Sequence, residues 1–253
     1  MQELYQKLFD ACSNEDGFDS MAHFVSMKGV HYDENELKFL LIGWAPNGWD
    51  PLLTINKEVF GLDAERQFNN IHRFRWIEEI NGALYSINDR ELPISKRYCL
   101  SNKHYWIKAK EVWRQLSNNT EERGIWQESI AWTNLYKIAP NTGNDPNPDE
   151  HLRSKQLEVC KEILSEEIRN YKPTHILIFS GYDVWFEPFK DVFEEVVDRK
   201  VRNISKGPNK NDVYVEATAR IGKAKVVVSC RPEYRDTEPF VKQIIEAFDS
   251  IKV

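Results

Sequence analysis

Residues 38–43 read Lys-Phe-Leu-Leu-Ile-Gly and continue directly into Trp44-Ala-Pro-Asn-Gly-Trp-Asp-Pro51. Three later segments have the same design, a short apolar run followed by a loop: 129–134 (Ser-Ile-Ala-Trp-Thr-Asn), 175–180 (His-Ile-Leu-Ile-Phe-Ser) and 225–230 (Lys-Val-Val-Val-Ser-Cys). Such runs, with helical stretches between them, are typical of parallel strands covered on both faces. Ligands of these sheets bind outside the carboxyl ends of the strands, so the sequence predicts the place of a site before its chemistry.

The segments around these runs predict a three-layer αβα sandwich with a central, mostly parallel four-stranded sheet. Helices are expected at 3–11, 19–27, 104–116, 148–171, 182–193 and 238–251. A further helix with a basic, aromatic side is expected over 68–77, and the β-rich stretches 194–204 and 212–221 predict a hairpin. No repeat or linker divides the 253 residues, so we expect a single domain, 1–253, with a helical insert at about 52–126.

Composition gives weaker guidance to function. The net charge of −6 is ordinary for a soluble protein, and a local basic face could still bind nucleic acid. The four cysteines, Cys12, Cys99, Cys160 and Cys230, are scattered without a CxxC pair, which argues against a compact zinc or iron–sulfur site. We therefore expect free thiols, no metal and no cofactor. The sequence shows neither a membrane-spanning run nor a signal-peptide pattern, so the expected location is the cytoplasm.

Two of the strand-end loops carry residues suited to ligand binding. Gly43 and Gly48 permit a sharp turn and a close approach of the backbone to a ligand, although such a turn is also common as a purely structural feature. Asn134 ends the second strand, and its amide offers both a donor and an acceptor, which suits the edge of an amide-like ring such as a pyrimidine. Hydrogen bonding within the loop is an equally good explanation for this asparagine.

On these loops the chain resembles the uracil-DNA glycosylase superfamily, most closely the branch that usually carries an iron–sulfur cluster. The first loop is similar to the motif G-E-A-P-G or G-L-A-P-A. The second is similar to T-N-x-x-K-x-x-P followed by N-R-x-P-x-P-x-E, and the last, Arg231-Pro232-Glu233, stands where the family has H-P-S. The matching residues of the first two motifs are Gly43, Trp44, Ala45, Pro46, Thr133, Asn134, Lys137, Pro140, Asn144, Pro146, Pro148 and Glu150.

The resemblance implies a four-stranded parallel sheet between helices, a groove for DNA and a pocket for a flipped base. It implies that Asn134 reads the Watson–Crick edge of the base. The loop containing Gly43, Trp44, Ala45 and Pro46 would form the pocket floor, with Trp49 as a stacking face. By the same resemblance, Tyr234 would insert into the minor groove beside Arg235.

The departures from the family concern the catalytic residues. Trp44 and Ala45 occupy the places of the residue that activates water, and Asp50 is the nearest carboxylate. Arg231 replaces the histidine that stabilises the departing base, and as a permanent cation it could still stabilise an anion. A salt bridge from Arg231 to Glu233 or Asp236 is the alternative. The cysteines that bind the cluster are missing.

Three functions follow from these residues. The favoured one is a uracil-DNA-glycosylase-like protein that binds DNA or a free nucleobase or nucleotide without hydrolysis. The second is an active DNA glycosylase, a hydrolase of DNA repair, that uses Asp50 and Arg231 on a non-standard base. The third is reuse of the fold for an unrelated small molecule or protein. No membrane partner is expected, and the sequence specifies no oligomeric state.

Overall fold

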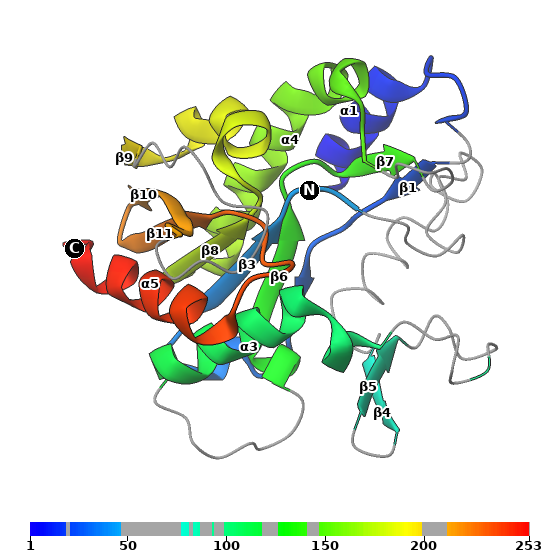
Figure 1. The fold of residues 1–253 in the computed structure, drawn as a ribbon. Helices are drawn as coiled ribbons and strands as arrows, with labels where there is room; N and C mark the ends of the chain where they lie inside the picture. The colour runs from blue at the N-terminus through cyan, green and yellow to red at the C-terminus, as the bar shows by residue number, and fades with distance from the viewer. Residues whose placement is uncertain are drawn as a thin grey trace.

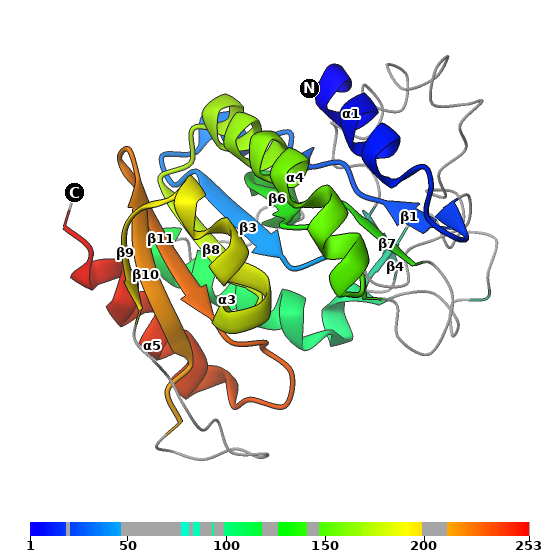
Figure 2. The same ribbon diagram turned by 90° about the horizontal axis from the view of Figure 1, so that it is seen from above.

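The computed structural model describes residues 1–18, 21–46, 77–80, 83–86, 93, 99–117, 126–140, 147–198 and 212–252. These residues build a mixed sheet of seven strands in the order β2-β6-β3-β8-β11-β10-β9 (Figure 1). Helices cover both faces of this sheet (Figure 2). The expected α/β class with three layers is therefore correct.

The four predicted strands form the centre of the sheet. They are β3 (Phe39–Gly43), β6 (Ile130–Asn134), β8 (His175–Phe179) and β11 (Ala224–Ser229). β3 lies between β6 and β8, β8 also pairs with β11, and all three pairings are parallel. Successive residues of a strand face opposite sides, so each strand contributes to both halves of the core.

The sheet extends beyond the four expected strands because antiparallel strands add to both edges. β2 (Met27–Lys28) pairs with β6 at one edge, and β10 (Val215–Ile221) and β9 (Glu194–Asp198) follow β11 at the other. The pairing of β9 with β10 confirms the predicted hairpin. A second hairpin joins β10 to β11 through Gly222, whose φ of 56° suits glycine.

Two groups of helices complete the layers. On one face lie α1 (Gln2–Cys12), α4 (Glu150–Tyr171), the π-helix η8 (Tyr182–Phe186) and the 3-10 helix η9 (Glu187–Val192). On the other face lie α3 (His104–Ser117) and α5 (Thr237–Ser250). Leu40 and Ile42 of β3 pack towards the first group, and Phe39 and Leu41 towards the second. This alternation is the reason the central strands are apolar throughout.

The smaller elements lie at the margins. β1 (Met21–His23) pairs with β7 (Ile138–Pro140), and β4 (Ile77–Ile80) pairs with β5 (Ala83–Ser86). Short 3-10 turns are η2 (Tyr32–Glu34), η6 (Leu100–Asn102) and η7 (Trp126–Ser129). The interval 52–126 therefore contains strands as well as the predicted helix α3.

Strands are present among the described residues of two segments where we expect helices. The helix expected over 19–27 is wrong, because its described residues form β1 and the start of β2, and residues 24–26 between them belong to no helix or strand. Met21, Ala22 and Phe24 are all buried, and so short an apolar run does not distinguish a helix from a strand; pairing with β7 and β6 decides. The helix expected over 68–77 lies outside the described residues except for Ile77, which begins strand β4.

Candidate functional site

The carboxyl ends of the four parallel strands lie in register. Gly43 is opposite both Asn134 and Phe179, and Phe179 is opposite Ser229. The loops that follow these strands therefore leave the sheet at one edge, where ligands of parallel sheets bind. Backbone hydrogen bonds then join the first two loops, from Leu135 N to Gly43 O (2.9 Å) and from Tyr136 N to Trp44 O (2.9 Å).

Asn134 is the most informative side chain at this edge. It is 3% exposed, and its Nδ2 is buried without a hydrogen-bond partner among the described residues. Gly43 gives its amide the space it occupies, because a Cβ at position 43 would lie 2.2 Å from Asn134 Oδ1. A buried amide that lacks a partner costs free energy, on the order of 1–3 kcal/mol, unless a ligand supplies the missing acceptor.

A buried ion pair fixes the backbone on which Asn134 stands. Lys137 Nζ donates to Glu167 Oε2 (2.9 Å), Thr133 Oγ1 (2.5 Å) and the carbonyl oxygen of Asn134 (2.6 Å). Lys137 and Glu167 are both completely buried. Gln156 of α4 accepts from the Lys137 backbone N–H at 3.0 Å. Helix α4 therefore holds the end of β6 rigidly against the edge of the sheet.

A cavity of about 590 Å³, which we call the Asn134 cavity, opens at this edge. Its walls combine aromatic faces with a small number of polar groups. The lining residues are Gly43, Trp44, Ala45, Asn102, Lys103, His104, Tyr105, Trp106, Trp132, Asn134, Glu233 and Tyr234. Inside, Trp132 Nε1 donates to Tyr105 Oη at 3.1 Å, which holds the phenol of Tyr105 close to Gly43. This composition suits a flat, partly polar ring.

Charged groups meet on one side of the Asn134 cavity. Glu233 lines it, and its Oε2 is buried without a partner among the described residues. Lys108 is completely buried, with its Nζ 3.5 Å from Nδ1 of His104. Burial lowers the pKa of Lys108, and the negative charges of Glu233 and Asp236 oppose that shift. The carboxylate of Glu233 on the wall of the cavity therefore acts electrostatically on the buried amine of Lys108.

Tyr234 stands at the rim of the Asn134 cavity. It is 83% exposed, has a φ of 58°, and its ring centre lies 6.3 Å from that of His104. Arg235, which we expected to act beside it, lies 3.6 Å from Asp212, a nearly buried carboxylate. The exposed aromatic ring is thus available to a partner, whereas Arg235 is engaged within the protein.

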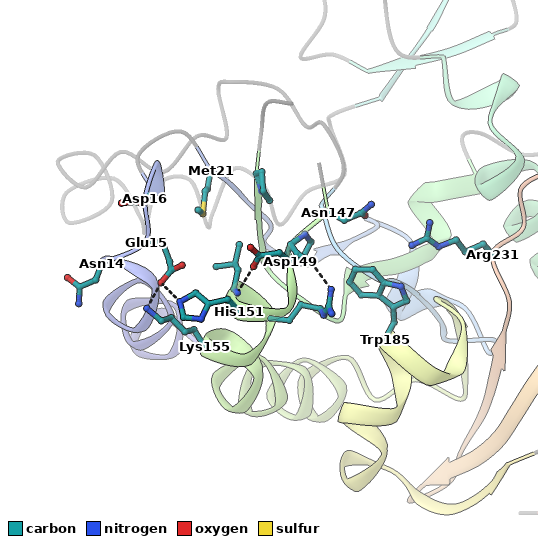
Figure 3. Close-up of a pocket in the computed structure, with 14 residues that line it drawn as sticks. Asn14, Glu15, Asp16, Met21, Asn147, Asp149, His151, Lys155, Trp185 and Arg231 are labelled. Carbon is teal, nitrogen blue, oxygen red and sulfur yellow. Dashed lines mark hydrogen bonds and ion pairs between the residues drawn. The ribbon is translucent and has the colours of Figure 1, made fainter. Parts of the chain in front are cut away.

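A second depression of about 890 Å³, which we call the Trp185 hollow, lies next to the first loop (Figure 3). The 14 residues drawn in Figure 3 line it: Asn14, Glu15, Asp16, Met21, Pro140, Asn147, Pro148, Asp149, His151, Leu152, Arg153, Lys155, Trp185 and Arg231. Charged and polar side chains dominate this set. The chemistry of the hollow therefore differs from that of the Asn134 cavity.

Trp44 connects the two depressions. It lines the Asn134 cavity, and the guanidinium of Arg231, in the Trp185 hollow, lies 4.3 Å from the centre of its ring. Its indole Nε1 donates to Asn147 Oδ1 at 2.8 Å, which fixes the ring. No carboxylate of the described residues forms an ion pair with Arg231, so the salt bridges considered for it with Glu233 and Asp236 are not formed.

The predicted site residues thus fall into three groups. Gly43, Trp44, Ala45, Asn134 and Tyr234 come together around the Asn134 cavity. Arg231 lines the neighbouring hollow, and Pro46 is buried and lines neither depression. Trp49 and Asp50 lie outside the described residues.

Several residues of the two depressions have no signal in the sequence. His104 and Tyr105 belong to a segment whose periodicity indicates only a helix that packs on the core, and the position of its first turn over the strand ends depends on the tertiary fold. Arg153 and Trp185 likewise enter the hollow from helices. The sequence does indicate Arg231 of the Trp185 hollow, because this arginine directly follows a strand end and precedes Pro232 and Glu233.

The chain matches no known protein-family model, and a search of curated proteins finds no match to it. Within the described ranges, no helix has both the length and the apolar character needed to span a membrane. In the same part of the chain, His, Cys, Asp and Glu side chains do not gather in groups of three or more that could hold a metal ion. Cys12, Cys160 and Cys230 are buried free thiols, and Cys99 is a half-buried one.

Proposed function

We propose that the Asn134 cavity binds a nucleobase, and that this protein is a distant relative of the uracil-DNA glycosylases that recognises a base without excising it. The observation that carries the proposal is the buried amide of Asn134, which lines the cavity and whose Nδ2 has no hydrogen-bond partner among the described residues. A pyrimidine edge presents a carbonyl acceptor beside a ring N–H donor, which is the complement of a carboxamide.

The walls of the cavity support a planar ligand. Trp44, Tyr105 and Trp132 offer aromatic surface, and stacking on such surfaces is worth roughly 1–3 kcal/mol per base. The exposed Tyr234 at the rim could stack with a neighbouring base or with the ring of a nucleoside. The arrangement of four neighbouring parallel strands between helices supports the proposed relationship as well.

Binding without excision is favoured by the position of Arg231. A group that stabilises a departing base must reach the base, and Arg231 lines the Trp185 hollow instead of the Asn134 cavity. The described carboxylate in the cavity is Glu233, which follows Arg231 by two residues. We therefore propose that hydrolysis by Asp50 and Arg231 is the lesser alternative.

Isothermal titration of the full chain with uracil tests the proposal. We expect saturable binding of uracil. Binding of 3-methyluracil, in which a methyl group replaces the N3–H between the two carbonyl groups, should be weaker by about tenfold or more. Asn134→Ala should cause a similar loss. Asn102→Ala is the matched control, because Asn102 lines the same cavity but is exposed, and uracil affinity should stay within about twofold.

Other nucleobases and nucleosides should be titrated in parallel. If none binds saturably, or if Asn134→Ala and Asn102→Ala behave alike, the proposal is wrong. A base-excision assay on uracil-containing DNA separates binding from catalysis. Abasic sites that disappear with Asp50→Asn would establish the glycosylase alternative in place of simple binding.

A further inference from the structure

We infer that the Trp185 hollow is a second ligand site, which binds the phosphate group of a small molecule between Arg153 and Arg231. This inference does not rest on the proposed nucleobase site, because the phosphate would lie in a different depression and bind different polar groups. Its starting point is two guanidinium groups that both lie against one indole ring.

Both arginines lie against Trp185. The guanidinium carbon of Arg153 is 5.1 Å from the ring centre, and that of Arg231 is 5.7 Å from it. Arg231 also lies 4.3 Å from the centre of Trp44, so it has aromatic rings as its neighbours. Cation–π contacts orient a guanidinium while leaving N–H donors free for a ligand, and the planar fork suits a phosphate oxyanion.

The charges of these two groups are not neutralised within the described residues. Arg153 Nη1 donates to the carbonyl oxygen of Pro148 at 2.9 Å, which positions the side chain without cancelling its charge. Arg231 has cation–π contacts and no ion pair there. An anion that reached both guanidinium groups would accept charge-assisted hydrogen bonds from each of them.

The backbone that carries Trp185 has an uncommon conformation. Gly181, with a φ of 81°, begins a π-helical turn in which Phe186 N donates to Gly181 O at 3.3 Å. Such turns are rare and occur frequently at functional sites. Here the turn presents Trp185 to Arg231 of the loop after β11 and to Arg153 in the first turn of α4. Three separate parts of the chain thus meet at this ring.

The rest of the hollow limits the size of the anion. Glu15 and Asp16 lie on the side of the view opposite Arg231 and Trp185 (Figure 3). Glu15 is paired with Lys155 and, at 3.4 Å, with His151. Asp149 caps helix α4 by accepting from Leu152 N at 2.8 Å. A nucleic-acid strand crossing this hollow would meet these carboxylates, so the charge distribution favours one phosphate group of a small ligand over a polyanion.

Titration of the full chain with inorganic phosphate tests the inference. Binding is followed by the indole N–H signals of Trp44 and Trp185 in NMR spectra of ¹⁵N-labelled protein, assigned with Trp44→Phe and Trp185→Phe. We expect saturable shifts of both signals, with an affinity that falls as the salt concentration rises. Acetate should bind more weakly, because a single carboxylate has fewer acceptor sites and less charge.

Substitutions localise the site. Arg231→Gln and Arg153→Gln should each weaken phosphate binding by about tenfold or more. Arg231→Lys keeps the charge but loses the planar fork, so it should also weaken binding. Lys155→Gln is the matched control: it removes a cation from the same hollow that is already paired with Glu15, and the affinity should change by less than about threefold.

Three results would overturn the inference: no saturable shift of either indole signal, an equal loss for Lys155→Gln and the arginine variants, or an affinity that grows steadily with the length of an oligonucleotide. The last result would identify a polyanion surface instead of a phosphate site. If uracil binds and phosphate does not, the proposed nucleobase site stands and the phosphate site is wrong. If phosphate binds and uracil does not, the phosphate site stands.

Discussion

The Asn134 cavity and the Trp185 hollow occupy the same edge of the sheet but are built in opposite ways. The cavity stands on the ends of β3 and β6, and its buried amide, Asn134, is held by a network from α4. The hollow is made of longer side chains that leave helices and loops, several of them exposed and charged. As proposed, the cavity would select by shape and by a single amide, and the hollow by charge.

This difference predicts different sensitivities to substitution. Removing the partner of a buried polar group costs much folding free energy, because water cannot replace the lost partner. Surface charges have small effects on folding because water and salt screen them. Substitutions of the buried polar groups around the cavity should therefore damage both the fold and the site, whereas substitutions of the exposed charged side chains around the hollow should damage the site alone.

The largest effect is expected for Lys137→Ala. It leaves Glu167 buried without its cation and releases the carbonyl oxygen of Asn134. The free energy of unfolding should fall by about 3–5 kcal/mol. Urea denaturation followed by circular dichroism measures this loss.

A surface ion pair between α1 and α4 supplies the control. Lys7 lies 3.6 Å from Glu162, with both side chains more than half exposed, and Lys7→Ala should cost less than about 1 kcal/mol. The double variant Lys137→Met with Glu167→Leu should recover most of the stability, because no unpaired charge remains. Equal costs for Lys137→Ala and Lys7→Ala would mean that the buried pair does not support the end of β6.

The sequence allowed the edge to be located, and specific residues show why. The runs that became β3, β6, β8 and β11 are apolar on both faces, so their membership of a mostly parallel sheet could be predicted from the sequence, whereas their order in the sheet could not. The structure places β3 beside β6 in register, and this brings Gly43 and Asn134 together. The sequence indicated both residues as strand-end candidates, and the resemblance to the glycosylases, rather than periodicity, singled out Asn134 as a base reader.

The remaining walls could not be predicted, because they depend on how the helices dock. Tyr105 stands in the first turn of α3, and only the packing of α3 brings it near Gly43. Arg153 and Arg231 are 78 positions apart in the chain, and each reaches the ring of Trp185, one from the start of α4 and the other from the loop after β11. Strand β2 was missed for the same reason: it has only two residues, and pairing with β6 defines it.

Gly43→Ala should affect the cavity more than the hollow. The added Cβ would lie 2.2 Å from Asn134 Oδ1, so the amide must move. We expect a loss of about 1–3 kcal/mol in stability. Uracil binding should weaken by about tenfold or more, because the donor is displaced. Calorimetric titration with uracil and with phosphate measures both sites in one protein.

Gly222→Ala is the control for this glycine. Its Cβ would meet open space, and only the backbone strain at a φ of 56° would destabilise the hairpin. Affinity for both ligands should then remain unchanged. A Gly43→Ala variant that binds uracil normally would show that the orientation of the Asn134 amide is not what selects the base.

The smallest effects should come from the two tryptophans, and they separate the sites most cleanly. Trp44 lines the cavity, and its ring makes a cation–π contact with the guanidinium of Arg231. Trp44→Leu should therefore weaken uracil and phosphate binding together. Trp185 lies against Arg153 and Arg231 and does not line the cavity, so Trp185→Leu should weaken phosphate binding alone. Each lost cation–π contact is worth about 1 kcal/mol, or roughly fivefold in affinity. Titrations of both variants with both ligands measure the pattern. If Trp44→Leu weakened only one ligand, the two depressions would not be coupled through this ring, and the position of Arg231 would have to depend on Trp185.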